Sequence, residues 1–114
     1  MPKNKVIANL DLLNIEITSH SLGKKVVFFN KNELQSSITQ IALGILDSGE
    51  IIPFHSHESM EEVFYILSGD GIFHIEDENI DVKENSCIRI PLGFLHSIKA
   101  NTQMKFLYFG VATN

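Results

Sequence analysis

Two histidines separated by one residue stand out because imidazole nitrogen is a common ligand of divalent metals. His55 and His57 follow the apolar segment 51–54. If residues 51–57 are extended, both side chains leave the same face of a strand, because side chains alternate along it. A pair so placed can bind one ion, at about 2.0–2.1 Å from nitrogen in the case of zinc. The alternative is a solvated turn before a strand, since such pairs also occur by chance in surface loops.

Three glutamates and a third histidine could complete such a site: Glu58, Glu61, Glu62 and His96. If residues 61–67 form a strand, Glu61 and Glu62 lie on opposite faces. Both faces carry apolar residues, which predicts a strand covered on both sides, so parity does not choose between the two acids. A carboxylate that faces an apolar interior is costly unless it is paired, hydrogen-bonded or bound to a cation. One acid therefore requires an internal partner, and the other can reach solvent at the end of the strand.

Short apolar segments between turn formers predict that many strands carry these residues. The segments are rich in Ile, Val, Phe and Tyr; they cover residues 24–29, 38–46, 62–67, 72–76, 86–90 and 105–112. Residues 6–17 fit either a short helical turn or an edge strand. A chain of 114 residues is long enough for one core. We therefore expect an all-β protein with a single domain over residues 1–114, folded as a closed antiparallel sandwich or barrel.

Composition narrows the class of protein. The hydrophobic content of 44% is typical of a globular chain, and the net charge of −5 offers no basic surface for nucleic acid. With Cys87 as the single cysteine, no intramolecular disulfide can form. The N-terminal residues lack the long apolar region of a secretory signal, and no apolar run approaches the roughly 20 residues that span a membrane. We expect a cytoplasmic protein that does not bind membranes.

Two motifs make the chain resemble the cupins, a family of small double-stranded β-helix (jelly-roll) barrels. The first motif covers residues 49–69 and consists of a glycine, an HxH pair, a glutamate and a second glycine at the family's spacing. It is matched by Gly49, His55, His57, Glu62 and Gly69. The six-residue gap to Gly69 selects Glu62 over Glu61. The second motif covers residues 85–101 and is matched by Pro91, Gly93 and His96.

The second motif departs from the family pattern at both ends. Asn85 stands where the family has glycine, and Ala100 stands where it has asparagine. Asparagine tolerates the left-handed conformation that a turn glycine often adopts, so we expect the turn at Asn85 to be preserved. The change at Ala100 puts a structural hydrogen bond in doubt. Neither position supplies a metal ligand in the family.

The resemblance implies that one divalent metal ion is bound inside the barrel by His55, His57, Glu62 and His96. This ligand set permits Mn, Fe, Co, Ni, Cu or Zn, because affinity order and metal supply decide which ion is bound. Three neutral imidazoles and one carboxylate leave a divalent ion with a net charge near +1. If the ion is six-coordinate, two positions stay open, which is typical of a catalytic site.

Small cupins that resemble this chain include isomerases, epimerases, decarboxylases and dioxygenases. The resemblance therefore implies a metal-dependent enzyme for a small polar substrate, such as a sugar derivative or an enolisable carbonyl compound, with the reaction and its catalytic residues left open. The alternative is a non-catalytic cupin that binds or senses a small ligand. Cupins are often dimers, and we expect a homodimer in which the apolar segments 6–15 and 24–29 add strands across the interface.

Other residues support weaker predictions. Gln40 and Tyr65 could form hydrogen bonds with a ligand, and Arg89 could bind a substrate anion or else point into solvent. We expect Cys87 to be a small core residue rather than a nucleophile. We expect His74 on a sheet surface. The aromatic residues expected to line the core or the cavity are Phe54, Phe64, Tyr65, Phe73 and Phe94.

Overall fold

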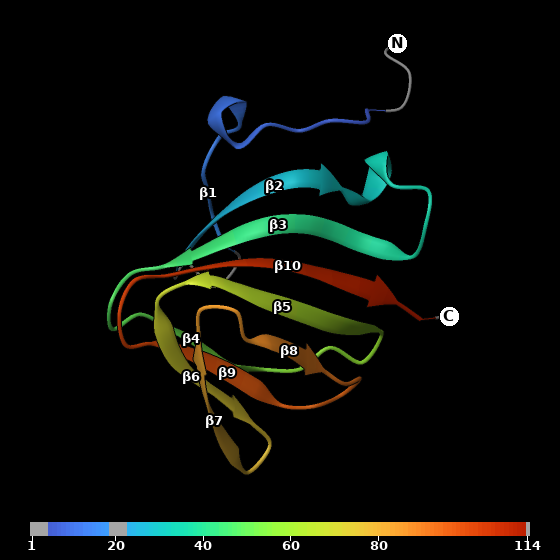
Figure 1. Cartoon of the computed structure of the whole chain (residues 1–114). Coiled ribbons are helices and arrows are strands. Elements are labelled where there is room, and N and C mark those ends of the chain that lie inside the picture. The colour runs from blue at the N-terminus through green and yellow to red at the C-terminus, as the bar shows by residue number, and fades with distance from the viewer. Residues whose placement is uncertain (1–4, 19–22, 114) are drawn as a thin grey trace.

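The computed structural model describes residues 5–18 and 23–113, and these form two antiparallel sheets (Figure 1). The larger sheet has the strand order β1 (Glu16–Ile17), β2 (Lys24–Asn30), β3 (Ile38–Leu46), β10 (Met104–Ala112), β5 (Met60–Ser68) and β8 (Cys87–Ile90). The smaller sheet has the order β4 (Ile51–His55), β9 (His96–Ala100), β6 (Asp70–Ile75) and β7 (Glu78–Lys83). Two 3₁₀ helices, η1 (Leu10–Leu12) and η2 (Lys31–Glu33), precede β1 and β3.

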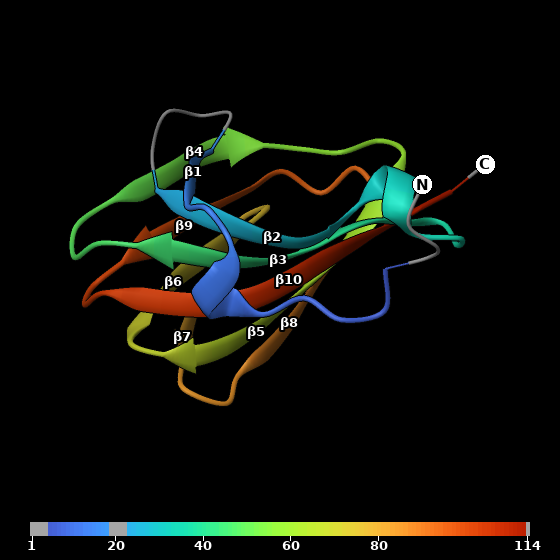
Figure 2. The same cartoon turned by 90° about the horizontal axis from the view of Figure 1, so that it is seen from above.

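The all-β prediction is confirmed, and every expected strand is found. The ambiguous segment 6–17 contains both alternatives, because η1 is a helical turn and β1 is a short edge strand. The segment with η1 lies along the β1–β2 edge of the larger sheet, at the top of Figure 1 and nearest the viewer in Figure 2. No helix in residues 5–18 or 23–113 is long and apolar enough to cross a membrane.

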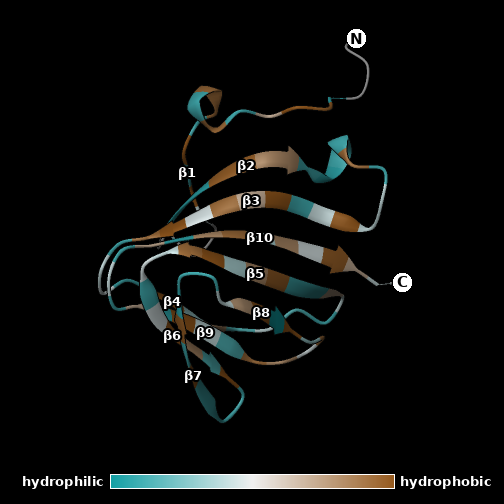
Figure 3. Ribbon diagram, in the orientation of Figure 1, coloured by the Kyte–Doolittle hydropathy of each residue, from teal (hydrophilic) through white to brown (hydrophobic). Residues whose placement is uncertain are grey.

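The core lies between the two sheets and is built from alternate residues of each strand. Phe64, Phe73 and Phe106 are buried at its centre. The Phe64 ring centroid lies 5.3 Å from that of Phe73 and 5.7 Å from that of Phe106. Figure 3 shows the hydrophobic residues along β2, β3 and β10, while β7 is largely hydrophilic. The contact between Phe64 and Phe73 joins the two sheets, while Phe64 and Phe106 pack within the larger one.

Strand β5 is covered on one face, so the prediction that both its faces are covered is wrong. Phe64 and Ile66 are buried, whereas Tyr65 and Leu67 are 38% and 44% exposed. The smaller sheet packs against one face of β5 and leaves the other to solvent. Glu62 shares the buried face with Phe64, because the two are separated by one residue.

Four residues expected inside lie at the surface instead, Tyr65 of β5 and three others. Cys87 is exposed, because it alternates along β8 with the buried residues Ile88 and Ile90. Phe54 and Phe94 are 54% and 39% exposed. Sequence hydrophobicity predicts burial, but strand alternation and loop direction decide it. His74 does lie on the outer face of its sheet, where its Nδ1 contacts the Asn79 side chain.

Both departures from the second cupin-like motif have a local explanation. Asn85 has a φ of 73°, so the left-handed turn is preserved as expected. The methyl group of Ala100 is fully buried. The Ala100 N–H donates to Glu50 O at 3.0 Å, and its carbonyl accepts from Gly49 N–H at 2.8 Å. Backbone hydrogen bonds therefore hold the end of β9.

Replacing either glycine of the first motif, Gly49 or Gly69, by alanine should lower the stability of the protein, but by different amounts. Both have a left-handed backbone, with φ of +85° at Gly49 and +83° at Gly69. A Cβ at Gly49 meets nothing within 4 Å, whereas one at Gly69 would lie 2.0 Å from Gln103 O. Gly49→Ala should lower the free energy of unfolding by about 1–2 kcal/mol, the backbone cost alone. Gly69→Ala should cost about 1–3 kcal/mol more because of the clash. Urea denaturation measures both, and equal losses would contradict the packing described.

Candidate metal centre

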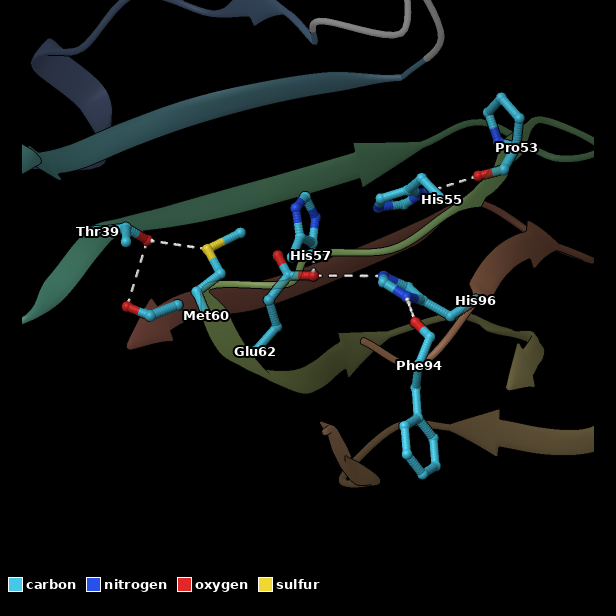
Figure 4. Close-up of polar contacts among 9 residues, drawn as sticks. Thr39, Pro53, His55, His57, Met60, Glu62, Phe94 and His96 are labelled. Carbon is cyan, nitrogen blue, oxygen red and sulfur yellow. Dashed lines mark hydrogen bonds and ion pairs between the residues drawn. The ribbon is translucent and has the colours of Figure 1, made fainter. Parts of the chain in front are cut away.

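Three histidines and one glutamate from distant parts of the chain meet between the sheets (Figure 4). His55 ends β4, and His96 begins β9 directly opposite it. Glu62 comes from β5 of the larger sheet, and His57 lies two residues beyond β4. One ligand atom from each of the four residues can be chosen so that all lie within 4.8 Å of one another. The structure thus brings together the four residues that the cupin resemblance implies as ligands.

The loop that carries His57 is held by the turn after β8. The Gly93 N–H donates to His57 O at 2.9 Å. Gly93 has a φ of +75°, and a Cβ there would approach the Glu58 carboxylate at 3.2 Å. Glycine therefore suits this position for both its conformation and its small size. Gly93 of the second motif thus holds the loop that carries His57 of the first motif.

Backbone carbonyls orient two of the imidazole rings. His55 Nδ1 lies 2.9 Å from Pro53 O, and His96 Nδ1 lies 2.9 Å from Phe94 O. A carbonyl oxygen only accepts hydrogen bonds, so Nδ1 carries the proton and donates it. In the neutral ring, Nε2 then carries the lone pair. Metal-binding histidines in proteins commonly have this arrangement.

Glu62 is the acid at the centre of the cluster. It is 7% exposed, and its Oε1 lies 3.4 Å from His57 Nε2 and 3.3 Å from His96 Nε2. Oε1 of Glu62 and Nε2 of His96 are nevertheless both buried without a hydrogen-bond partner. A protonated His96 would form an ion pair with Glu62 at this distance. The two side chains are not oriented for a hydrogen bond, however. A divalent cation satisfies the carboxylate and the imidazole together, so these residues fit a metal.

The neighbouring acids have other surroundings. Glu61 lies on the outer face of β5, where its Oε2 accepts a hydrogen bond from Arg89 Nη1 at 2.7 Å. Glu58 packs against Gly93 and is exposed. Strand parity did not choose between Glu61 and Glu62, whereas the spacing of the first motif selected Glu62. Glu62 is the acid that lies in the cluster.

A cavity of about 140 Å³ adjoins the cluster. Its polar lining includes Thr18, Lys25, Gln40, Glu62 and Tyr108, and its apolar lining includes Ile52, Phe64, Ile98 and Phe106. Gln40 thus lies where a ligand contact was predicted. Tyr65 and Arg89 do not line this cavity, because the Tyr65 hydroxyl donates to Asn85 Oδ1 at 2.8 Å and Arg89 binds Glu61. The ligand contacts of all three residues stay predictions.

Sequence reasoning missed four polar residues of the cavity: Thr18, Lys24, Lys25 and Tyr108. Burial raises the pKa of Tyr108 to about 12, and the negative charges of Glu62 and Glu16 add to the shift. The phenol therefore stays protonated at neutral pH and can donate a hydrogen bond. Strand parity was the available signal for Tyr108, because it lies two residues from the buried Phe106 and so shares its face of β10.

Known proteins resemble the chain in sequence and in fold. It is 34% identical over 64 residues to an oxalate-binding protein of Thermotoga maritima, covering 54% of this chain and 53% of that protein. It is 33% identical over 69 residues to an uncharacterised protein of Methanocaldococcus jannaschii, covering 59% of this chain and 55% of that protein. The chain therefore spans about half the length of the curated relatives it matches.

Solved structures extend the likeness to nearly the whole chain. A predicted oxalate decarboxylase of Thermotoga maritima superposes with a TM-score of 0.87 at 22% identity, covering 95% of this chain and 100% of that one. A cupin of the RmlC-like type from Shewanella frigidimarina superposes with a TM-score of 0.81 at 14% identity, covering 100% and 96%. These likenesses confirm the jelly-roll cupin fold. The family model of the cupin domain matches residues 42–110, which is more than half of the chain, and the chain therefore belongs to the cupin family.

Proposed function

We propose that this cupin is a metal-dependent enzyme that acts on a small carboxylate, with decarboxylation as the reaction. The observation that carries the proposal is the pair of unsatisfied buried atoms, Glu62 Oε1 and His96 Nε2, next to a cavity. We propose His55, His57, Glu62 and His96 as the ligands of one divalent ion. When bound, such an ion would polarise a ligand oxygen and stabilise negative charge.

The size of the cavity supports a small ligand. A volume of about 140 Å³ is close to that of an engineered protein cavity that admits benzene, a molecule with about six non-hydrogen atoms. Oxalate has the same number of non-hydrogen atoms. The names of the relatives support oxalate as the first compound to test, because one is called an oxalate-binding protein and another a predicted oxalate decarboxylase. Decarboxylation of oxalate consumes one proton and yields formate and carbon dioxide without net oxidation.

Residues of the chain support this chemistry around the cluster. The Tyr108 hydroxyl, which is protonated at neutral pH, can donate a hydrogen bond to a ligand oxygen. Apolar walls from Ile52, Phe64 and Phe106 limit the access of water to the ligand. Fewer competing waters strengthen each electrostatic contact within the cavity.

A non-catalytic cupin that binds the same ligand is the second candidate. The relative in Thermotoga maritima is named for oxalate binding, not for a reaction. Both candidates use the same metal cluster and the same cavity. Product formation is the property that separates them.

We also propose that two copies of the chain associate through the N-terminal segment. Apolar side chains at positions 6–17 are strongly exposed, with Val6 at 87%, Ile7 at 77% and Leu12 at 83%. They lie beside β1, which is an unpaired edge of the larger sheet. Exposed apolar patches and free sheet edges are typical of protein interfaces.

Replacing Glu62 should remove the metal. Glu62→Gln keeps the size of the side chain but loses the charge, and we expect the affinity for Mn²⁺ or Zn²⁺ to fall by at least about tenfold. Glu61→Gln is the matched control, because Glu61 lies one residue away on the outer face. Elemental analysis of tag-free protein, followed by competition with a chelator, measures both. His57→Ala and His96→Ala should behave as Glu62→Gln does, and wild-type metal content in these variants would refute the ligand assignment.

Metal-loaded protein should bind oxalate and release products from it. Calorimetry measures binding, and detection of formate and carbon dioxide measures turnover. Binding with turnover supports the decarboxylase, whereas binding without products supports the second candidate. Absence of any binding in the metal-loaded protein would contradict oxalate as the ligand.

The protein should sediment as a dimer at micromolar concentration. A charge in the N-terminal segment, Ile7→Glu, should shift sedimentation toward the monomer. Ile80→Glu is the control, because Ile80 is a 37% exposed apolar residue of β7 in the other sheet. A wild-type protein that sediments only as a monomer would rule out this interface.

A further inference from the structure

A lysine side chain enters the cavity that adjoins the histidine cluster. Lys25 of β2 pairs with Gly44 of β3, and Gly44 pairs with Phe106 of β10. Residues directly opposite each other in neighbouring strands project from the same face. Phe106 is a core residue, and a Cβ at Gly44 would meet its ring at 2.6 Å, so this is the inner face. Lys25 is half-buried there and lines the cavity together with His55, His57 and Glu62.

The Lys25 ammonium has no carboxylate partner in residues 5–18 and 23–113. The lysine and arginine ion pairs of these residues join Lys5 to Glu33 and Arg89 to Glu61. Glu16 lies opposite Lys25 across β1 and β2 but forms no ion pair with it. Partial burial of a charge without a counterion is unfavourable. An anion inside the cavity would offset this cost.

The charge of the cavity also differs from that of the whole chain. The chain has a net charge of −5, yet Lys25 and the more exposed Lys24 both line the cavity, and a divalent ion would outweigh the Glu62 carboxylate. Low-dielectric walls strengthen the attraction of such a cavity for anions. A neutral sugar derivative would leave the ammonium without a partner.

We propose that Lys25 forms an anion-binding subsite of the cavity and makes it selective for ligands with two carboxylates. One carboxylate would lie at the cluster of His55, His57, Glu62 and His96, and the second would contact the Lys25 ammonium. This inference rests on the proposed function, because it assumes a small carboxylate ligand at the cluster. It adds a residue that determines specificity and lies outside both cupin motifs.

Two probes of nearly equal shape test the subsite. Oxalate has two carboxylates, and in oxamate one of them is replaced by an uncharged amide. Calorimetry with the metal-loaded protein gives the affinity for each probe. The variants are Lys25→Met, which removes the charge, and Lys25→Arg, which keeps it. Lys105→Met is the matched control, because Lys105 is an exposed lysine of the same sheet that does not line the cavity.

We expect Lys25→Met to lose affinity for oxalate more than for oxamate. Lys25→Met should weaken oxalate binding by about ten- to a hundredfold, as expected for a hydrogen bond between charged groups, and oxamate binding much less. Lys25→Arg should retain most of the oxalate affinity, and Lys105→Met should stay near the wild type. Thermal unfolding and metal content of each variant show whether the fold and the cluster are intact. Lys25→Gln replaces Lys25→Met if the latter does not fold.

The outcomes separate this inference from the proposed function. If the wild type binds oxalate and Lys25→Met keeps the same ratio of oxalate to oxamate affinity, the subsite is refuted while the proposed function stands. If the metal-loaded wild type binds neither probe, the small-carboxylate function is refuted, and the subsite with it.

Discussion

A carboxylate buried among apolar side chains is the constraint on which the site depends. Glu62 shares the inner face of β5 with Phe64, where an unpaired negative charge is strongly unfavourable. Its Oε1 faces imidazole nitrogens but forms no hydrogen bond with them. The fold can retain this charge at low cost if a cation lies between the carboxylate and the histidines. Burial and the missing hydrogen bond thus fit a cation at this place, and they support the proposed metal site.

The two sheets position this cluster by different means. Pairing of β4 with β9 places His55 opposite His96, and backbone carbonyls orient both rings. His57 lies outside regular structure and depends on the Gly93 N–H for its loop conformation. Glu62 approaches from the other sheet. A change in the packing between the sheets would therefore separate the carboxylate from the imidazoles.

Much of the fold, and the grouping of the four candidate ligands, could be predicted from the sequence. Short β-branched segments between turn residues identified most strands, though not β7 or β9, and the spacing from Glu62 to Gly69 selected the acid that lies in the cluster. The exposure of Phe54 and Cys87 could not be predicted, because it depends on which face of each strand the other sheet covers. Lys25 was missed for a similar reason. Its strand was recognised, but only the register with Gly44 shows that the side chain faces the cavity.

Diffraction at the absorption edge of a bound metal would show where this protein holds an ion. Crystals of tag-free protein, measured above and below the edge, locate the ion by its anomalous signal. We expect one site between the sheets, with the Glu62 carboxylate and nitrogens of His55, His57 and His96 at about 2.0–2.2 Å if the ion is zinc. An ion bound elsewhere, or no anomalous signal between Glu62 and these histidines in metal-free crystals soaked with zinc, would contradict this site.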